Sequence, residues 1–312
     1  MAEKNFYFTI INKNYILRGV TLYNSISKFL NHKSKFVIVC VDETSCEIIQ
    51  KLSLENCKVI SLETLQAYNL SKISKKRKIN ELCWTLKPVV MDFIALNFKD
   101  SRWIIYMDSD SMVFKNLDDI LLNNYDIILT PHNFSDNREK GLEAKVGKYN
   151  AGFVAVKTTK NGKKAIKFWM KKCLEWCKDV PDKNKYADQK YLDLIENKFD
   201  NVVNNIDGVN IAPWNISYSK KLDLKNMKVL FYHMQGFKIY NERIFCVYSY
   251  NYKISKNTYN SIYKPYINLL RLTFMQLKKK KINAFQSKEF KLDFLLFLRL
   301  LYNRSNVLRV II

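Results

Sequence analysis

The chain has 312 residues, of which 48% are apolar, and its 7 glycines and 5 prolines are too few for a linker-rich or low-complexity protein. Its 52 basic and 29 acidic residues leave a formal net charge of +23, which favours polyanionic partners: phosphorylated substrates, anionic membranes or nucleic acids. No run approaches the roughly 20 apolar residues of a membrane-spanning helix, and residues 1–5 show no apolar signal core. We therefore expect an enzyme-sized α/β protein of the cytoplasm.

Apolar runs alternate with helical patterns in the first part of the chain. Residues 5–11 and 35–41 have the composition of buried strands, and residues 15–30 between them place apolar side chains at helical spacing. A helix over 43–53 and a strand over 57–61 continue the pattern. Because such alternation is typical of a parallel sheet covered by helices, we expect a Rossmann-like fold.

A basic connection over residues 71–78 precedes the next helix and contains Lys75-Lys76-Arg77-Lys78. The apolar helix that follows runs to Phe98. Pro88 is expected in its first turn, where proline is favoured, and this places Lys87 near the helix start. Arg77 and Lys87 are either solvated charges or cations that meet the phosphate or base of a ligand.

An apolar run over residues 103–107 leads directly into Asp108 and Asp110. Side chains two apart on a strand point to the same face, and ligands of parallel sheets bind at the carboxyl ends of the strands. Two adjacent carboxylates repel each other unless a cation such as Mg²⁺ or Mn²⁺ neutralises them. The sequence thus predicts a divalent-cation site, and the alternative is an acidic turn, since Asp and Ser are ordinary turn residues.

Shorter elements complete the predicted sheet. We expect a short helix over 117–122, strands over 125–132, 148–156 and 229–236, and a helix over 161–177. Asn150 and Gly152 lie near the start of the strand over 148–156. A glycine there either permits close approach of a ligand to the backbone or shapes a bulge.

These segments occur in an order that resembles nucleotide-sugar-dependent glycosyltransferases of the GT-A fold, over residues 5–240. After the N-terminal strand–helix–strand pattern come Asp108-Ser109-Asp110, Asn150-Ala151-Gly152-Phe153, Asp188-Gln189 and His233-Met234-Gln235-Gly236-Phe237-Lys238. The order is similar to glycosyltransferase family 8 and to bacterial surface-polysaccharide transferases. The resemblance implies a mixed, mostly parallel GT-A sheet flanked by helices.

The resemblance also implies the residues of the site. Asp108, Asp110 and His233 would bind Mn²⁺ or Mg²⁺ against the diphosphate of a nucleoside-diphosphate sugar, by default a UDP-sugar. Further donor contacts would come from Ser109, Gly236, Lys238, Lys87 and Arg77. The residues at the reacting sugars would be Asp188, Gln189 and Asn150.

Some of these residues depart from the family pattern or have a structural alternative. Family 8 sequences usually continue Lys-Pro-Trp, whereas Lys238 is followed by Ile239-Tyr240. His233 at the end of an apolar strand is alternatively a half-buried core histidine. Asp188 is alternatively an exposed helix residue that pairs with a neighbouring lysine.

The last fifth of the chain is strongly basic, with 13 basic and 2 acidic residues over 251–312. Lys278-Lys279-Lys280-Lys281 precedes an amphipathic pattern over 290–302, which is typical of attachment to anionic lipid. We expect a GT-A domain over 1–250 and a basic helical region over 251–312, peripheral on the inner face of the cytoplasmic membrane. Alternatively this helix packs on the domain or forms a dimer.

The predicted function is transfer of a hexose to a saccharide or lipid-linked saccharide acceptor in bacterial surface glycan synthesis. One alternative is a sugar nucleotidyltransferase, but these enzymes usually carry a glycine-rich phosphate loop after the first strand and residues 11–15 contain no glycine. The other is a nucleic-acid-binding protein that uses the basic and aromatic residues over 237–266. No recognised nucleic-acid module is visible, so we expect no nucleic-acid partner.

Overall fold

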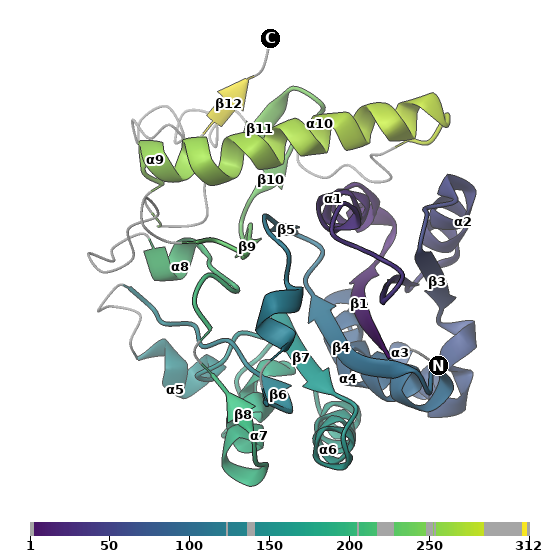
Figure 1. Cartoon of the computed structure of the whole chain (residues 1–312), viewed down its shortest axis with the longest axis vertical. Helices are drawn as coiled ribbons and strands as arrows, with labels where there is room; N and C mark the ends of the chain where they lie inside the picture. The colour runs from purple at the N-terminus through teal and green to yellow at the C-terminus, as the bar shows by residue number, and fades with distance from the viewer. Residues whose placement is uncertain are drawn as a thin grey trace.

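The structure is a computed structural model of the chain, and it describes residues 3–122, 124–135, 141–204, 206–216, 228–247, 252, 254–283 and 308–310. Its centre is a seven-stranded sheet with the strand order β3-β2-β1-β4-β7-β6-β8 (Figure 1). The strands are β1 (Lys4–Ile11), β2 (Ser34–Cys40), β3 (Cys57–Ser61), β4 (Ser101–Met107), β6 (Ile127–Ile128), β7 (Phe153–Lys157) and β8 (Val202–Val203). Strand β7 is antiparallel to both neighbours and the other pairs are parallel, which confirms the predicted mixed, mostly parallel sheet.

Alternate residues of the strands build two apolar cores, one on each face of the sheet. Tyr7 and Trp103 belong to the first core, which is covered by α1 (Ile16–Ser27), α2 (Glu43–Leu52) and α10 (Lys264–Lys279). Phe8 and Tyr106 belong to the second, which is covered by α3 (Leu70–Ser74), α4 (Ile79–Asn97), α6 (Lys160–Glu175) and α7 (Leu192–Lys198). Burial of both faces of the central strands explains why their sequences are apolar without alternation.

Smaller elements accompany the central sheet, and the β5–β9 pair among them follows the carboxyl end of β4. Strand β5 (Ser111–Val113) pairs antiparallel with β9 (Phe231–His233), and Ser111 lies opposite His233. A second small sheet contains β10 (Lys238–Ile239), β11 (Ile244–Cys246) and β12 (Leu308–Val310). The short helices are α5 (Leu142–Val146), α8 (Pro213–Ile216) and α9 (Lys256–Thr258). The β5–β9 pairing brings His233, at the end of β9, next to Asp110.

The predicted start of the helix that contains Lys87 is wrong. Helix α4 begins at Ile79, so Pro88 lies inside it and Lys87 is a buried residue near its middle. The helix starts early because the carboxylate of Glu81 accepts a hydrogen bond from the backbone N–H of Lys78 at 2.9 Å. This bond satisfies a donor that would otherwise have no partner at the helix end.

Three predicted strands are shorter than expected. The strand predicted over 148–156 begins only at Phe153, the one over 125–132 is reduced to Ile127–Ile128, and the one over 229–236 is reduced to Phe231–His233. The side chain of Asn150 accepts a hydrogen bond from the backbone N–H of Gly152 at 2.9 Å, which turns the chain out of the strand ladder. The turn places both residues next to the site described below.

Helix α10 packs against α1 and contributes to the first core. Asn24 of α1 donates hydrogen bonds to Thr273 Oγ1 and Gln276 Oε1, both at 2.9 Å. Figure 1 shows α10 lying across one end of the molecule, next to α1. The predicted helix over 290–302 lies outside the described residues, and the boundary at residue 250 stays a prediction. In the ranges that the structure describes, no helix combines the length and apolarity needed to cross a membrane.

Candidate active site

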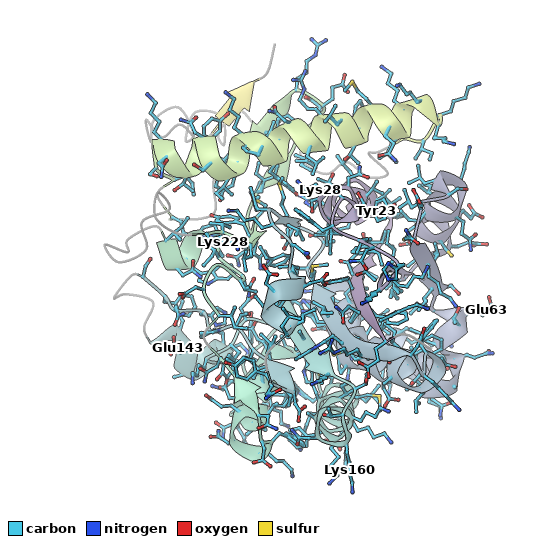
Figure 2. The ribbon with its side chains drawn as sticks, viewed as in Figure 1. Tyr23, Lys28, Glu63, Glu143, Lys160 and Lys228 are labelled. Atoms are coloured by element: carbon cyan, nitrogen blue, oxygen red, sulfur yellow. The ribbon has the colours of Figure 1, made fainter. Side chains whose placement is uncertain are left out.

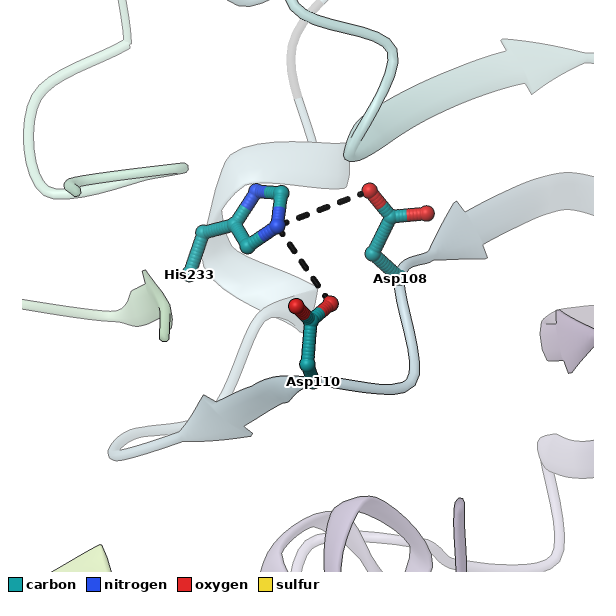
Figure 3. Close-up of side chains that lie close together, drawn as sticks. All are labelled: Asp108, Asp110 and His233. Carbon is teal, nitrogen blue, oxygen red and sulfur yellow. Dashed lines mark ion pairs between the residues drawn. The ribbon is translucent and has the colours of Figure 1, made fainter. Parts of the chain in front are cut away.

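Two carboxylates and an imidazole meet where β4 ends (Figure 3). Nε2 of His233 lies 3.3 Å from Oδ1 of Asp110 and 3.6 Å from Oδ2 of Asp108. One ligand atom from each of the three lies within 4.8 Å of the others. Asp108 and Asp110 follow β4 rather than belonging to it, so they meet through the turn into β5 and the β5–β9 pairing and not through strand alternation.

The charges of this cluster suit a divalent cation. Burial alone would raise the pKa of Asp110, but His233, together with Arg18 and a backbone hydrogen bond, outweighs burial and holds this pKa below its ordinary value. Burial would lower the pKa of His233, but Asp110 and then Asp108 raise it above its ordinary value. The two carboxylates therefore favour a positive charge between them, and a bound Mn²⁺ or Mg²⁺ would take the place of the imidazolium proton.

The neighbours of Asp108 assign different roles to its two oxygens. The Tyr106 hydroxyl donates a hydrogen bond to Oδ1 at 2.5 Å, and Lys87 Nζ lies 3.6 Å from the same oxygen. Burial, with Asp108 beside it, raises the pKa of Tyr106 well above its ordinary value, so this hydroxyl stays a donor. Oδ2 of Asp108 is left facing His233 as the atom that can bind a metal.

Lys87 forms a buried ion pair with Asp188. Its Nζ lies 3.1 Å from Oδ2 of Asp188, donates to the carbonyl of Ala151 at 3.0 Å and lies 4.6 Å from the ring centre of Tyr106. Burial disfavours the ammonium ion, but Asp108 and Asp188 raise the pKa of Lys87 above its ordinary value. Burial raises the pKa of Asp188, and Lys87 opposes this shift. The alternative that Asp188 is an exposed helix residue is wrong, since it is 2% exposed.

The orientation of Asn150 is fixed by hydrogen bonds. Its Oδ1 accepts from the Gly152 N–H at 2.9 Å and from Asn210 Nδ2 at 3.0 Å, and Asn210 Nδ2 also donates to Thr130 Oγ1 at 2.8 Å. Because the backbone donor of Gly152 requires an oxygen, the amide NH₂ of Asn150 is the group presented to a ligand. Asn210 is a positioning residue that the sequence interpretation missed.

These groups line one cavity with a volume of about 670 Å³. The predicted site residues in its wall are Lys87, Asp108, Ser109, Asp110, Asn150, Asp188, Gln189 and His233. Gln189 Nε2 donates to the carbonyl of Val146 at 2.8 Å, so its side-chain oxygen is the atom it can offer to a ligand. The cavity thus brings together the predicted metal ligands and the predicted sugar-contacting residues.

Three residues predicted to contact the donor do not belong to the described lining of this cavity: Arg77, Gly236 and Lys238. Arg77 donates to the Thr85 hydroxyl and to the carbonyl of Leu174 at 2.9 Å, which ties α4 to the last turn of α6. Gly236 adopts a positive φ of 78° in the turn before β10, and Lys238 begins that strand. Their donor contacts stay predictions.

The cavity wall also contains residues that the sequence interpretation missed. Asn12, Asn14 and Tyr15 follow β1 and line the cavity. Because β1 and β4 are parallel neighbours, their carboxyl ends meet at one edge of the sheet, and this was the signal that could have found them.

Aromatic rings form a further part of the wall. His132 stacks on Phe134 with ring centres 4.7 Å apart, and Trp214 lies 5.8 Å from His132 and 5.3 Å from His233. All of these residues line the cavity. Flat aromatic surfaces beside polar groups suit the apolar faces of sugar rings.

Comparisons with known proteins agree with this geometry. The family model described as nucleotide-diphospho-sugar transferase matches residues 31–234. The uncharacterized protein YfnF of Bacillus subtilis (strain 168) is 30% identical over 250 residues, which are 75% of this chain and 82% of YfnF.

Solved structures show the same fold at low sequence identity. The galactosyltransferase LgtC in complex with donor and acceptor sugar analogs matches with a TM-score of 0.54 and 12% identity over 88% of this chain and 99% of LgtC. The bifunctional glycosyltransferase WbbM matches with a TM-score of 0.53 and 12% identity over 90% of this chain, which spans about half of WbbM (52%). The chain therefore belongs to the nucleotide-diphospho-sugar transferase family and is a nucleotide-sugar glycosyltransferase of the GT-A fold.

Proposed function

We propose that this glycosyltransferase moves a hexose from a nucleoside-diphosphate sugar, by default a UDP-sugar, to a saccharide acceptor, with a divalent metal as cofactor. The observation that carries the proposal is the juxtaposition of the Asp108–Asp110–His233 cluster and the Lys87–Asp188 ion pair in one cavity. Bound Mn²⁺ or Mg²⁺ would offset the charge that develops on the leaving diphosphate.

We place the donor across the carboxyl ends of the neighbouring strands β1 and β4. Asn12, Asn14 and Tyr15 at the end of β1 suit the nucleoside, because two amides and a ring can hydrogen-bond and stack on a base. Asp108, Asp110 and His233 at the end of β4 would then hold the metal at the diphosphate. This order along the edge leaves the Lys87–Asp188 pair beside the transferred sugar.

The polar groups around that sugar offer complementary atoms. Asn150 offers amide hydrogens, and Gln189 offers a carbonyl oxygen, because their other atoms are already hydrogen-bonded to the protein. Lys87 holds Asp188 in place and supplies the positive charge that makes its burial tolerable. A sugar has both hydroxyl donors and hydroxyl acceptors, so such a mixed wall suits it.

The acceptor is placed against the aromatic wall of His132, Phe134 and Trp214, since a sugar ring stacks its apolar face on flat rings. A lipid-linked acceptor and a place in bacterial surface glycan synthesis at the inner face of the cytoplasmic membrane are the finer parts of the proposal. They are supported by the sequence resemblance.

A panel of nucleotide sugars, read out by release of the nucleoside diphosphate with and without Mn²⁺, tests the proposal. Asp108→Asn and Asp110→Asn should each lower Mn²⁺-dependent turnover by more than about 100-fold, since even the outer-shell partners of metal ligands contribute 10–100-fold. Asp119→Asn is the matched control, because the side chain of Asp119 is 69% exposed and lies outside the cavity wall.

Wild-type turnover by either site variant in excess chelator would contradict metal dependence. Formation of a nucleotide sugar from a sugar phosphate and a nucleoside triphosphate, with release of pyrophosphate, would support the alternative nucleotidyltransferase instead.

A further inference from the structure

Helix α10 has one face that nothing in the described structure covers. Its buried side chains lie in the first core, to which α1 also contributes, whereas seven residues on the opposite side are exposed: Lys264, Asn268, Arg271, Leu272, Met275, Lys278 and Lys279. At 100° per residue these seven fall in one continuous stripe along the helix. We call this stripe the outer face of α10.

Every charged residue of the outer face is a lysine or an arginine. The sequence contains no acidic residue between Glu242 and Glu289, and Lys280 and Lys281 extend the charge beyond the helix end. Helix α1, which packs against α10, also contains no acidic residue. No carboxylate therefore neutralises the face from its own helix or from α1.

Two apolar side chains lie among these cations. Leu272 is 58% exposed and Met275 is 50% exposed, whereas the aromatic Tyr266 of the same helix is fully buried. A row of lysines and one arginine around exposed aliphatic side chains is the chemistry that meets an anionic bilayer: the charges approach the headgroups and the aliphatic chains enter the acyl boundary.

We propose that the outer face of α10 is a docking surface for an anionic lipid bilayer. Nucleic acid is the less fitting polyanion, because sequence-tolerant nucleic-acid surfaces add exposed aromatic rings for stacking and this face has none among its seven residues. A second copy of the chain is also less fitting, since two such faces would repel each other.

Co-sedimentation of the full chain with vesicles tests the proposal. The chain should bind vesicles of phosphatidylglycerol and phosphatidylcholine, bind pure phosphatidylcholine far less, and dissociate as salt is raised. The triple variant Arg271→Glu/Lys278→Glu/Lys279→Glu should weaken binding to the anionic vesicles by roughly 100-fold or more, since each surface cation contributes separately.

The matched control reverses three exposed lysines at the opposite end of the molecule: Lys163→Glu/Lys164→Glu/Lys167→Glu on α6. Figure 2 labels Lys160 at that end and Lys28 at the end near α10. The control has the same net charge as the test variant, and its vesicle binding should stay close to that of wild type. Equal loss of binding in both variants would show that net charge alone acts, and would overturn the proposal.

A second variant keeps the charges and removes the aliphatic side chains. Leu272→Ser/Met275→Ser should weaken vesicle binding while its salt dependence remains, which separates the apolar contribution from the electrostatic one. Unchanged binding by this variant would show that Leu272 and Met275 do not enter the bilayer, and would overturn the proposed docking of this face. Tighter binding of the wild type to single-stranded RNA than to vesicles, or a concentration-dependent dimer that this variant dissociates, would assign the face to the other occupants.

Discussion

Gly152 is the residue whose small size the site needs most. A Cβ atom at this position would lie 2.6 Å from Nδ1 of His233 and 2.6 Å from Oδ1 of Asn150, both closer than real contacts allow. Gly152→Ala should therefore displace His233 and weaken Mn²⁺ binding by at least about 10-fold, by analogy with the loss of other groups that orient metal ligands. Electron paramagnetic resonance of free Mn²⁺ measures this without any turnover.

Gly141→Ala is the control for Gly152→Ala, because a Cβ at Gly141 would meet nothing within 4 Å. If both variants bind Mn²⁺ as tightly as wild type, His233 does not need its present position to bind the metal.

The buried Lys87–Asp188 ion pair makes a prediction about stability. Lys87→Met leaves Asp188 buried without its cation, so the free energy of unfolding should fall by about 3–5 kcal/mol. The double variant Lys87→Met/Asp188→Asn removes both charges. Its loss of unfolding free energy should be smaller than the sum of the losses of the two single variants. Urea unfolding followed by tryptophan fluorescence measures Lys87→Met, Asp188→Asn and the double variant.

Lys171→Met is the control, because the Lys171–Glu175 pair is 4.0 Å long and exposed, and its loss should leave the unfolding midpoint unchanged. Additive effects in the Lys87 and Asp188 variants would mean that the two side chains do not interact.

His132 makes the stability depend on pH. Burial lowers its pKa to about 4, against about 6.5 in an unfolded chain, although its hydrogen bond to the carbonyl of Lys148 acts in the opposite direction. The unfolded chain therefore binds the extra proton first. The contribution is fully present above pH 6.5 and is lost as pH falls toward 4, by about 3 kcal/mol in total.

His132→Gln should flatten this part of the pH profile of the unfolding free energy, while the other titrating groups act equally in both proteins. Urea unfolding at pH 7, 6 and 5 gives the difference between the two proteins. A difference that does not change with pH would show that His132 is not buried as a neutral group.

At the scale of elements, the strands were predictable because their apolar runs are long and end in polar residues. The ends of β1 and β4 and the position of Asp108 follow from this pattern alone. The start of α4 was not predictable in this way, because Pro88 is the stronger helix-start signal in the sequence and the Glu81 carboxylate outweighs it only in the folded chain.

The site residues that the sequence did not reveal are those that position other site residues by hydrogen bonds. Tyr106 and Asn210 touch Asp108 and Asn150, but each looks like an ordinary core or turn residue in its own segment. Their roles depend on contacts between segments far apart in the chain, and no local spacing encodes such contacts. The same holds for the β5–β9 pairing that brings His233 to Asp110.

At the scale of the molecule, the question is whether residues 251–312 form a separate part or belong to one cooperative unit with the sheet. The described part of this region favours one unit, because Tyr263, Tyr266 and Leu270 lie in the same core as Tyr7 and Trp103. A separate region would unfold in a transition of its own, whereas one core unfolds in a single transition.

Leu270→Ala and Leu272→Ala test this on one helix with the same chemical change. Leu270 is 1% exposed and should cost about 3 kcal/mol of unfolding free energy, because the lost side chain leaves a cavity in the core. Leu272 is 58% exposed and should cost less than about 0.5 kcal/mol. If the core is shared, Leu270→Ala lowers the single urea transition of the whole chain, seen equally by tryptophan fluorescence and circular dichroism. A separate early transition that carries only part of the helical signal would instead establish α10 as an independent region, and the sheet with its cavity would then fold without it.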